Sequence, residues 1–400
     1  MGRMRAVRKV AGSYASSLAS LSFNFGGLVA GIMLATSLDV MASVRWGVLL
    51  FPSIISVRGA IGGLFSGRIS TALHIGTIRP SMRGNTKHLW ILYDSTTVLS
   101  LIMGLVLWAF GCAFGVLFAE LTMIDLLYML LAILTTLAIS VLFVSPATAL
   151  VSIESMKRGA DPDVSTYPII STVADILVTM TYILVVSALR FSWSLGVFTV
   201  ISVLFVLSCV VLLWIDRDEP DMITTLRESL MVLPLIAFFV NISGSTLDRI
   251  GTVITNEPAI YMIYPAIIDT VGDVGSVVGS TATTKLNLGT AHSSLRLFKD
   301  QLSEIAGTWS ASLTLFVAYA LISFSAVGLN TGTSLSVLIM RISLTNLMAV
   351  GIGVVISLLM ALGTFRRGWD PDNFVIPVES TFADAVTSLS LFAATLLVWL

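Results

Sequence analysis

The sequence predicts an all-α polytopic membrane protein, and two observations carry this prediction: the composition of the chain and its division into two similar halves. Of 400 residues, 56% are hydrophobic and only 11% are charged, and the mean hydropathy is strongly positive. A soluble domain cannot bury so much apolar surface, so lipid must surround most of the chain. An ordinary soluble protein is therefore excluded.

The apolar segments are long enough to be membrane spans. A hydrocarbon core of ~30 Å takes about 20 apolar residues per helix. Apolar runs between charged or turn-rich breaks give about 11 transmembrane helices. We expect them at residues 14–37, 46–76, 90–119, 124–152, 165–190, 194–215, 230–250, 258–290, 303–328, 334–362 and 374–400.

Lys and Arg are unevenly distributed over the expected loops. With the N-terminus inside, the positive-inside rule is satisfied, so we expect a cytoplasmic N-terminus and a C-terminus outside. We also expect a multi-pass protein of the plasma membrane. The outside loops then hold Arg45, Arg190 and Arg249, and the inside loops hold Arg79, Arg83, Lys87, Lys157, Arg158, Arg217, Arg227, Arg296, Lys299, Arg366 and Arg367.

The chain repeats itself. Residues 52–77 align without gaps to residues 265–290, with nine identities in 26 positions. Residues 161–175 align to residues 370–384, with eight identities in 15 positions. Such internal similarity indicates a duplication of one helical unit.

The duplication predicts how the helices are organised. Each repeat holds five spans, so a second copy would be inverted unless one further helix intervened, and the apolar run near residue 200 supplies that helix. We therefore expect two parallel five-helix repeats joined by one extra linking helix. The boundaries are 1–190 for the first repeat, 191–220 for the linking helix and loop, and 221–400 for the second repeat.

Asp175 and Asp384 occupy equivalent positions in the two repeats, each twelve residues beyond an Asp-Pro-Asp loop. At 1.5 Å per residue they lie ~18 Å into the membrane. A carboxylate there costs at least ~2.5–3.5 kcal/mol, so each should face a partner, water or the bundle interior. Carboxylates, carbonyls and retained waters suit a hard cation such as Mg²⁺. The structural alternative is a pairing with Arg58, Arg68 or Lys285.

Other residues refine this interpretation. Asp273 is an additional candidate metal ligand, and its equivalent in the first repeat is Ala60. The three histidines and two cysteines are scattered, so a site of soft ligands is not indicated. No phosphate-binding loop is present, so ion gradients or voltage must supply the energy. We expect no required cofactor and Mg²⁺ as the transported ion.

At these motifs the sequence resembles the MgtE-type divalent cation transporters, especially their two-repeat relatives among the solute carriers. The resemblance implies Mg²⁺ transport through a pore between two five-helix units, with Asp175 and Asp384 as ion ligands. Members with one repeat dimerise to form that pore. This chain holds both halves, so we expect one copy to suffice, with a homodimer as the alternative. The motifs are Pro52 to Thr71, Pro265 to Thr284, Asp161 to Asp175 and Asp370 to Asp384.

Two features depart from the family pattern. The Asn that commonly follows the second-helix Gly is Ala60 in one repeat and Asp273 in the other, so the ion path is chemically lopsided. About ten residues precede the first expected span, where bacterial members carry magnesium-sensing domains. Gating by such a sensor is therefore not predicted.

Other functions fit less well. An intramembrane aspartyl protease also uses two acids that share a proton, but its Tyr-Asp and Gly-x-Gly-Asp settings differ from Val-Ala-Asp175 and Phe-Ala-Asp384. A non-transporting scaffold does not explain the paired acids. Transport of another cation, such as Mn²⁺ or Ca²⁺, stays open. We expect a transporter rather than an enzyme, with the lipid bilayer and a divalent cation as partners and no nucleic acid.

Overall fold

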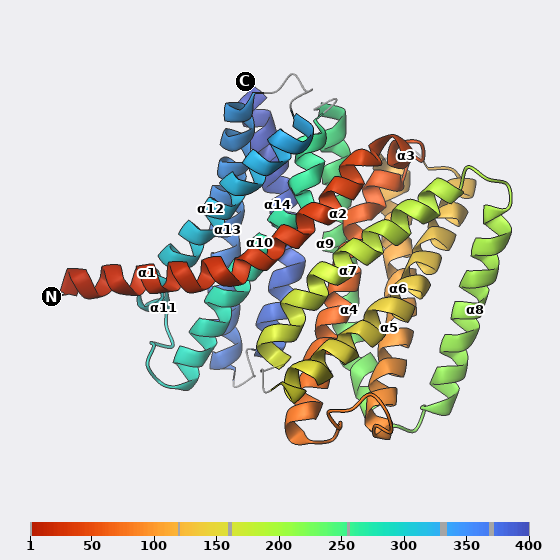
Figure 1. The fold of residues 1–400 in the computed structure, drawn as a ribbon, viewed down its shortest axis with the longest axis horizontal. Coiled ribbons are helices and arrows are strands. Elements are labelled where there is room, and N and C mark those ends of the chain that lie inside the picture. The colour runs from red at the N-terminus through yellow and green to blue at the C-terminus, as the bar shows by residue number, and fades with distance from the viewer. Residues whose placement is uncertain are drawn as a thin grey trace. The chain divides into compact units, whose positions relative to one another are not determined.

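The computed structural model describes residues 2–118, 121–158, 162–253, 257–328, 334–367 and 372–399, which contain helices and no β-strand (Figure 1). The predicted all-α class is confirmed. The helices are α1 (Gly2–Leu21), α2 (Phe25–Thr36), α3 (Leu38–Ala42), α4 (Gly47–Ile75), α5 (Lys87–Phe118), α6 (Met123–Lys157), α7 (Pro162–Ala188), α8 (Ser194–Ile215), α9 (Pro220–Val253), α10 (Pro258–Asn287), α11 (Leu297–Asp300), α12 (Leu302–Ser323), α13 (Leu335–Arg366) and α14 (Asp372–Trp399), with a 3₁₀ turn η1 (Ser22–Asn24) and a π turn η2 (Phe324–Gly328).

Each of the eleven predicted segments coincides with helix, but not every helix has the composition of a membrane span. In the described residues, eight segments are long and apolar enough to cross a membrane. The helices α9, α10 and α14 are not among them, so eleven spans and the parallel arrangement of repeats stay predictions. The eight are Val7–Thr36, Gly47–Ile75, Lys87–Ala113, Met123–Lys157, Ile170–Ala188, Ser194–Ile215, Leu302–Val327 and Leu335–Arg366.

Local sequence explains where several helices begin and end. Thr122 and Asp125 form a capping box at the start of α6, in which each side chain accepts from the other residue's main-chain N–H. Gly76 after α4 has φ 81° and Gly289 after α10 has φ 66°, a conformation that favours glycine. These glycines lie 213 positions apart, the spacing of the first repeat alignment. The two equivalent helices therefore end in the same way.

The chain forms two compact units. Unit 1 comprises Met1–Ala35 and Thr246–Leu400, and unit 2 comprises Thr36–Ser245. In unit 2, α4 packs against α5, α6 and α7, and α6 packs against α5 and α7. In unit 1, α10 packs against α12, α13 and α14, and α13 packs against α12 and α14. Four equivalent helices of each repeat thus have the same neighbours.

The first helix of each repeat packs in the unit that holds the other repeat, through a close approach at a glycine. A Cβ atom added at Gly31 in α2 would lie 1.7 Å from the carbonyl oxygen of Met262 in α10. One added at Gly244 in α9 would lie 1.9 Å from the carbonyl oxygen of Leu49 in α4. Gly244 follows Gly31 by 213 positions, and Met262 follows Leu49 by the same number. The two contacts are therefore equivalent and reciprocal.

A neighbouring contact obeys the same spacing. Gly27 in α2 approaches the backbone of Ala266 in α10, where an added Cβ would lie 2.9 Å from the Ala266 nitrogen. In unit 2, the Ser53 hydroxyl of α4 donates a 2.9 Å hydrogen bond to the carbonyl of Val240 in α9. Val240 follows Gly27, and Ala266 follows Ser53, by the same 213 positions.

The compact units divide the chain differently from the predicted boundaries 1–190, 191–220 and 221–400. Those boundaries remain a prediction about the duplication.

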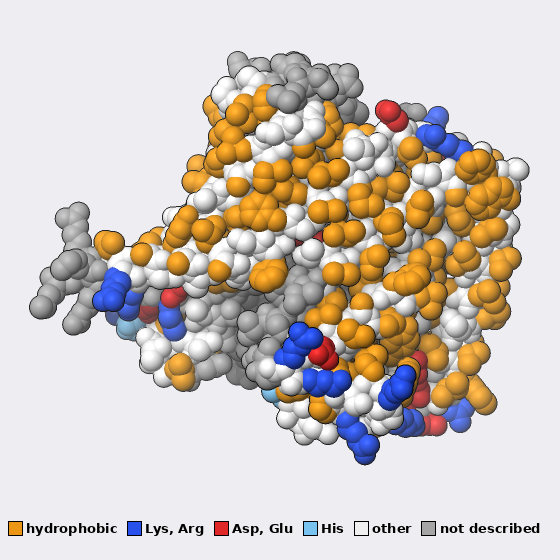
Figure 2. Space-filling view, viewed as in Figure 1, with side chains coloured by type: hydrophobic (Ala, Val, Ile, Leu, Met, Phe, Trp, Pro, Cys, Tyr) orange, Lys and Arg blue, Asp and Glu red, His pale blue; other side chains and the backbone are white. Residues whose placement is uncertain are grey.

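The outer surface of unit 2 is that of a membrane protein. Figure 2 shows hydrophobic side chains along the sides of its helices and charged side chains at the helix ends. On α8, Leu204, Leu207 and Trp214 are 61%, 55% and 72% exposed. Because an exposed apolar face this large is unfavourable in water, lipid must cover it. This confirms a multi-pass membrane protein.

Candidate cation site

The two acids predicted from the duplication are both buried. Asp175 lies in α7 of unit 2 and is 5% exposed, and Asp384 lies in α14 of unit 1 and is 6% exposed. Each unit therefore supplies one buried carboxylate from the last helix of a repeat. Acids at such positions need hydrogen bonds, a counter-charge or a bound cation.

In unit 1, Asp273 belongs to a polar cluster among apolar helices. The Asn24 side-chain amide donates a 2.8 Å hydrogen bond to the Asp273 carboxylate and lies 3.3 Å from the Thr270 hydroxyl. The Thr270 hydroxyl shares a 3.1 Å hydrogen bond with the Tyr319 hydroxyl. Asp269 and Asp273 both lie within electrostatic range of that tyrosine. The cluster joins η1, α10 and α12.

The same part of α10 also packs against the helix that carries Asp384. A Cβ added at Gly272 would lie 3.7 Å from the side chain of Ala383 in α14. Asp273 and Asp384 are the next residues after these two contacting positions. The structure therefore places two of the three predicted metal ligands in one unit, on two helices that touch at that level.

Further polar groups surround Asp384. The Ser388 hydroxyl donates a 2.7 Å hydrogen bond to the main-chain carbonyl of Asp384 and shares another of 2.7 Å with the Tyr264 hydroxyl. Tyr264 lies in α10, within electrostatic range of the Asp384 carboxylate. This part of unit 1 offers carboxylate, hydroxyl and carbonyl oxygens, which are the ligands of hard divalent cations.

Around the equivalent glycine of α4, unit 2 carries a basic residue instead of an acid. Arg58 in α4 is 1% exposed, and one of its nitrogens donates a 3.0 Å hydrogen bond to the Ser145 hydroxyl of α6. Its Nε and Nη1 atoms have no hydrogen-bond partner among the described residues. Val271 stands at the Arg58 position in unit 1, and Ala60 at the Asp273 position in unit 2. The two units thus have different electrostatics at equivalent places.

Two of the basic residues considered as counter-charges for Asp175 and Asp384 form bonds with other residues. Arg68 in α4 bonds to the Thr225 hydroxyl of α9. Lys285 in α10 donates a 2.7 Å hydrogen bond to Gln301 and lies 3.6 Å from the Glu304 carboxylate. These contacts hold helix ends together.

Sequence reasoning missed Asn24, Thr270 and Tyr319. They lie on three elements, and no spacing in the sequence connects them. The signal available was an amide, Asn24, inside an otherwise apolar first span. The first residues of the two Asp-Pro-Asp loops, Asp161 and Asp370, lie outside the described residues.

The comparison with protein families decides the identity of these repeats. The family model "MgtE: Divalent cation transporter" matches residues 51–185 and 264–394, one region in each repeat. The chain belongs to the MgtE family. The match covers more than half of the chain and agrees with a two-repeat form. MgtE proteins are transporters and not enzymes, so a protease function is not supported.

Other comparisons add little to the MgtE assignment. Among curated proteins, no sequence matches this chain. A solved structure titled "Crystal structure of eukaryotic MATE transporter AtDTX14" aligns over 99% of this chain and 97% of its own, with 14% identity and a TM-score of 0.17. A TM-score this low carries no argument about fold or function.

Proposed function

We propose that this MgtE-family chain carries Mg²⁺ across the plasma membrane, along a path to which each repeat contributes one mid-membrane carboxylate. Asp175 and Asp384 are the proposed ligands, and Asp273 is the third. The observation that carries the proposal is the burial of Asp175 and Asp384 at equivalent positions of a divalent cation transporter family. Mn²⁺ and Ca²⁺ are the alternative cargoes.

Ligand chemistry supports Mg²⁺ over softer metals. The candidate ligands are carboxylates, and their neighbours Asn24, Thr270, Tyr319 and Ser388 offer only oxygen and amide groups. Mg²⁺ and Ca²⁺ take oxygen ligands, whereas zinc and copper favour imidazole and thiolate. A divalent ion that moves through 100 mV gains ~4.6 kcal/mol, so a membrane potential can drive uptake without a cofactor.

The proposed orientation puts the N-terminus in the cytoplasm and the C-terminus outside. The loop between α4 and α5 and the turn between α8 and α9 then face the cytoplasm, where basic residues are favoured. We propose that one copy of the chain, which holds both repeats, is sufficient for transport, and the alternative is a homodimer.

Flux into proteoliposomes tests the proposed function. Vesicles loaded with a magnesium-sensitive dye receive the native chain, Asp175→Asn, Asp384→Asn or the control Asp218→Asn under a fixed membrane potential. Asp218 is a matched control because its side chain is 88% exposed in the α8–α9 turn. We expect Mg²⁺ flux in the native chain and the control, and loss of flux in both other variants. Flux indifferent to both buried acids would overturn the proposal.

A further inference from the structure

A second pair of acids lies in unit 2, on helices other than α7, which carries Asp175. Asp94 is the eighth residue of α5, and Asp216 follows the last residue of α8. Their carboxyl groups lie within hydrogen-bonding distance of each other. The Asp216 backbone is fixed, because its N–H donates a 2.9 Å hydrogen bond to the carbonyl of Leu212. The end of α8 therefore holds one carboxyl group against another on α5.

Asp216 is only 3% exposed, and its Oδ2 atom has no hydrogen-bond partner among the described residues. Asp94 is partly exposed. An acceptor oxygen that is both buried and unpartnered is costly, and it indicates a group that the surrounding side chains do not supply. The pair thus includes a buried carboxylate oxygen to which the described residues supply no donor.

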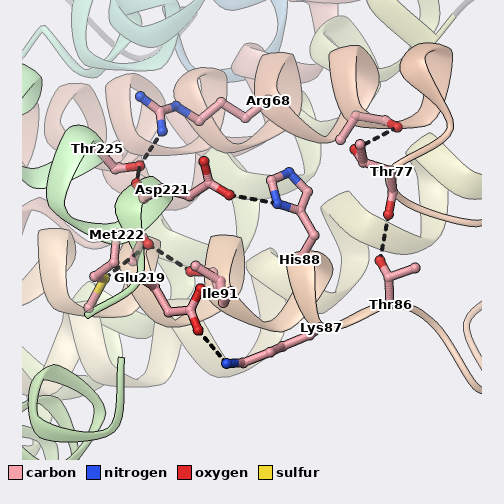
Figure 3. A network of polar contacts seen from close by, with 12 residues as sticks. Arg68, Thr77, Thr86, Lys87, His88, Ile91, Glu219, Asp221, Met222 and Thr225 are labelled. Carbon is pink, nitrogen blue, oxygen red and sulfur yellow. Dashed lines mark hydrogen bonds and ion pairs between the residues drawn. The ribbon is translucent and has the colours of Figure 1, made fainter. Parts of the chain in front are cut away.

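Neighbouring charges have other partners. Figure 3 shows Lys87 bonded to Glu219, and His88 Nδ1 lies 2.9 Å from the Asp221 carboxylate. Arg217 lies 3.3 Å from the carboxylate of Asp218. These contacts pair basic side chains with the other acids of the α8–α9 turn and the start of α9. Lys87 also lies within electrostatic range of Asp216, but its ammonium group bonds to Glu219.

Two carboxylates this close do not both stay ionised by themselves. Either one of them binds a proton, or a cation lies between them. A divalent cation satisfies both at once, because carboxylate oxygens are its preferred ligands and it completes its shell with water. The partial exposure of Asp94 gives such waters access. The buried Asp216 Oδ2 supplies a ligand that no donor in the described residues occupies.

We propose that Asp94 and Asp216 form a divalent-cation site that joins the end of α8 to α5. The site shares no residue with the proposed transport ligands Asp175, Asp273 and Asp384. It takes Mg²⁺ or a similar hard cation and stabilises the attachment of the linking helix. The proposal does not depend on the proposed transport function, because it concerns binding and stability only.

Binding of Mn²⁺ to the full chain in detergent tests this site. Free Mn²⁺ is measured by electron paramagnetic resonance for the native chain, Asp94→Asn, Asp216→Asn and the control Asp218→Asn, with Mg²⁺ as competitor. We expect Asp94→Asn and Asp216→Asn each to bind one Mn²⁺ fewer per chain than the native chain and the control. Unchanged stoichiometry in both variants would overturn the proposal, and it would indicate a shared proton.

Thermal unfolding gives a second, independent measurement. In EDTA, Asp94→Asn should match or exceed the native Tm, because the repulsion between two carboxylates is removed. Added Mn²⁺ should raise the native Tm by several degrees more than that of the variant. An equal loss of Tm with and without Mn²⁺ would mean a structural hydrogen bond and would overturn the proposal. Asp94 is partly exposed, so its variant should fold and decides the test alone. Neither experiment measures Mg²⁺ flux, so failure of this site leaves the transport proposal standing.

Discussion

The two units share helix packing but differ in charge beside one pair of equivalent glycines. Unit 2 carries Arg58 and Ala60 around Gly59 of α4, whereas unit 1 carries Val271 and Asp273 around Gly272 of α10. One unit thus has a buried guanidinium and the other a partly buried carboxylate at nearly the same place. A duplicated scaffold can keep its backbone contacts while its two copies acquire different chemistry, because packing depends on helix shape and charge depends on single side chains.

The largest expected effect tests whether the contact of α2 with α10 is equivalent to the contact of α9 with α4. Gly31→Ala and Gly244→Ala should each lower the free energy of unfolding by on the order of 3 kcal/mol, because the new methyl group overlaps a carbonyl oxygen. Thermal unfolding in detergent measures both. Gly196→Ala in α8, where a Cβ meets no atom within 4 Å, is the control and should not lower stability. A loss in only one of the two variants would break the equivalence.

The next effect concerns the acid present in unit 1 alone. Asp273→Ala introduces the residue of unit 2 and removes the acceptor of the Asn24 amide. Since Asp273 is a proposed ligand, the loss of ~1.5–3 kcal/mol of interaction with the ion corresponds to a fall in Mg²⁺ flux of about 10- to 100-fold. Asp269→Ser, which introduces the Ser56 equivalent and keeps the Asn24 bond, should have a smaller effect. Flux equal to that of the native chain would remove Asp273 from the cation path.

Removal of the buried charge of unit 2 should change stability by less than the glycine substitutions do, and in the opposite direction. Arg58→Met removes a guanidinium that has two nitrogens without a partner among the described residues. Replacing a poorly compensated buried charge by an apolar side chain should stabilise the chain by about 1–2 kcal/mol. Unfolding midpoints of the native chain, Arg58→Met and Ser145→Ala measure this. A clear loss of stability in Arg58→Met would show that the guanidinium is well paired in the native protein.

The smallest expected effect is a difference in the pH dependence of stability between the loop after α4 and the loop after α10. In unit 1, the main-chain N–H and ring of His292 hold the pKa of Asp300 below its usual range. The contribution of Asp300 to stability is therefore present above its unfolded pKa of about 3.9 and is lost as pH falls through the lower folded value. The Tm difference between the native chain and Asp300→Asn should be small at pH 7 and smaller near pH 3.

In the loop of unit 2, the neutral Asn85 side chain accepts the N–H groups of Arg79 and Thr86. Because an amide does not titrate in this range, the Tm difference between the native chain and Asn85→Ala should be the same at both pH values. A pH-dependent difference for Asn85→Ala, or a pH-independent one for Asp300→Asn, would contradict this comparison.

Much of the candidate site could be predicted from the sequence and part of it could not. Asp175 and Asp384 were found because duplication keeps them at equivalent positions, and Asp273 because an acid in an apolar span is conspicuous. Asn24 was missed because its partner Asp273 lies 249 positions away in another repeat. The pair Asp94 and Asp216 was missed for the same reason, since each acid alone reads as the polar end of a helix.

The sequence by itself determined the membrane class, the positions of the helices and the duplication, because apolar length, turn residues and self-similarity are local properties of the chain. It also determined the family, since the motifs lie within two matched regions. Only the tertiary structure decided that α2 packs on α10 and α9 on α4, and which polar groups meet. Those choices depend on backbone approach at Gly31 and Gly244, where the absence of a side chain lets helices distant in sequence come together.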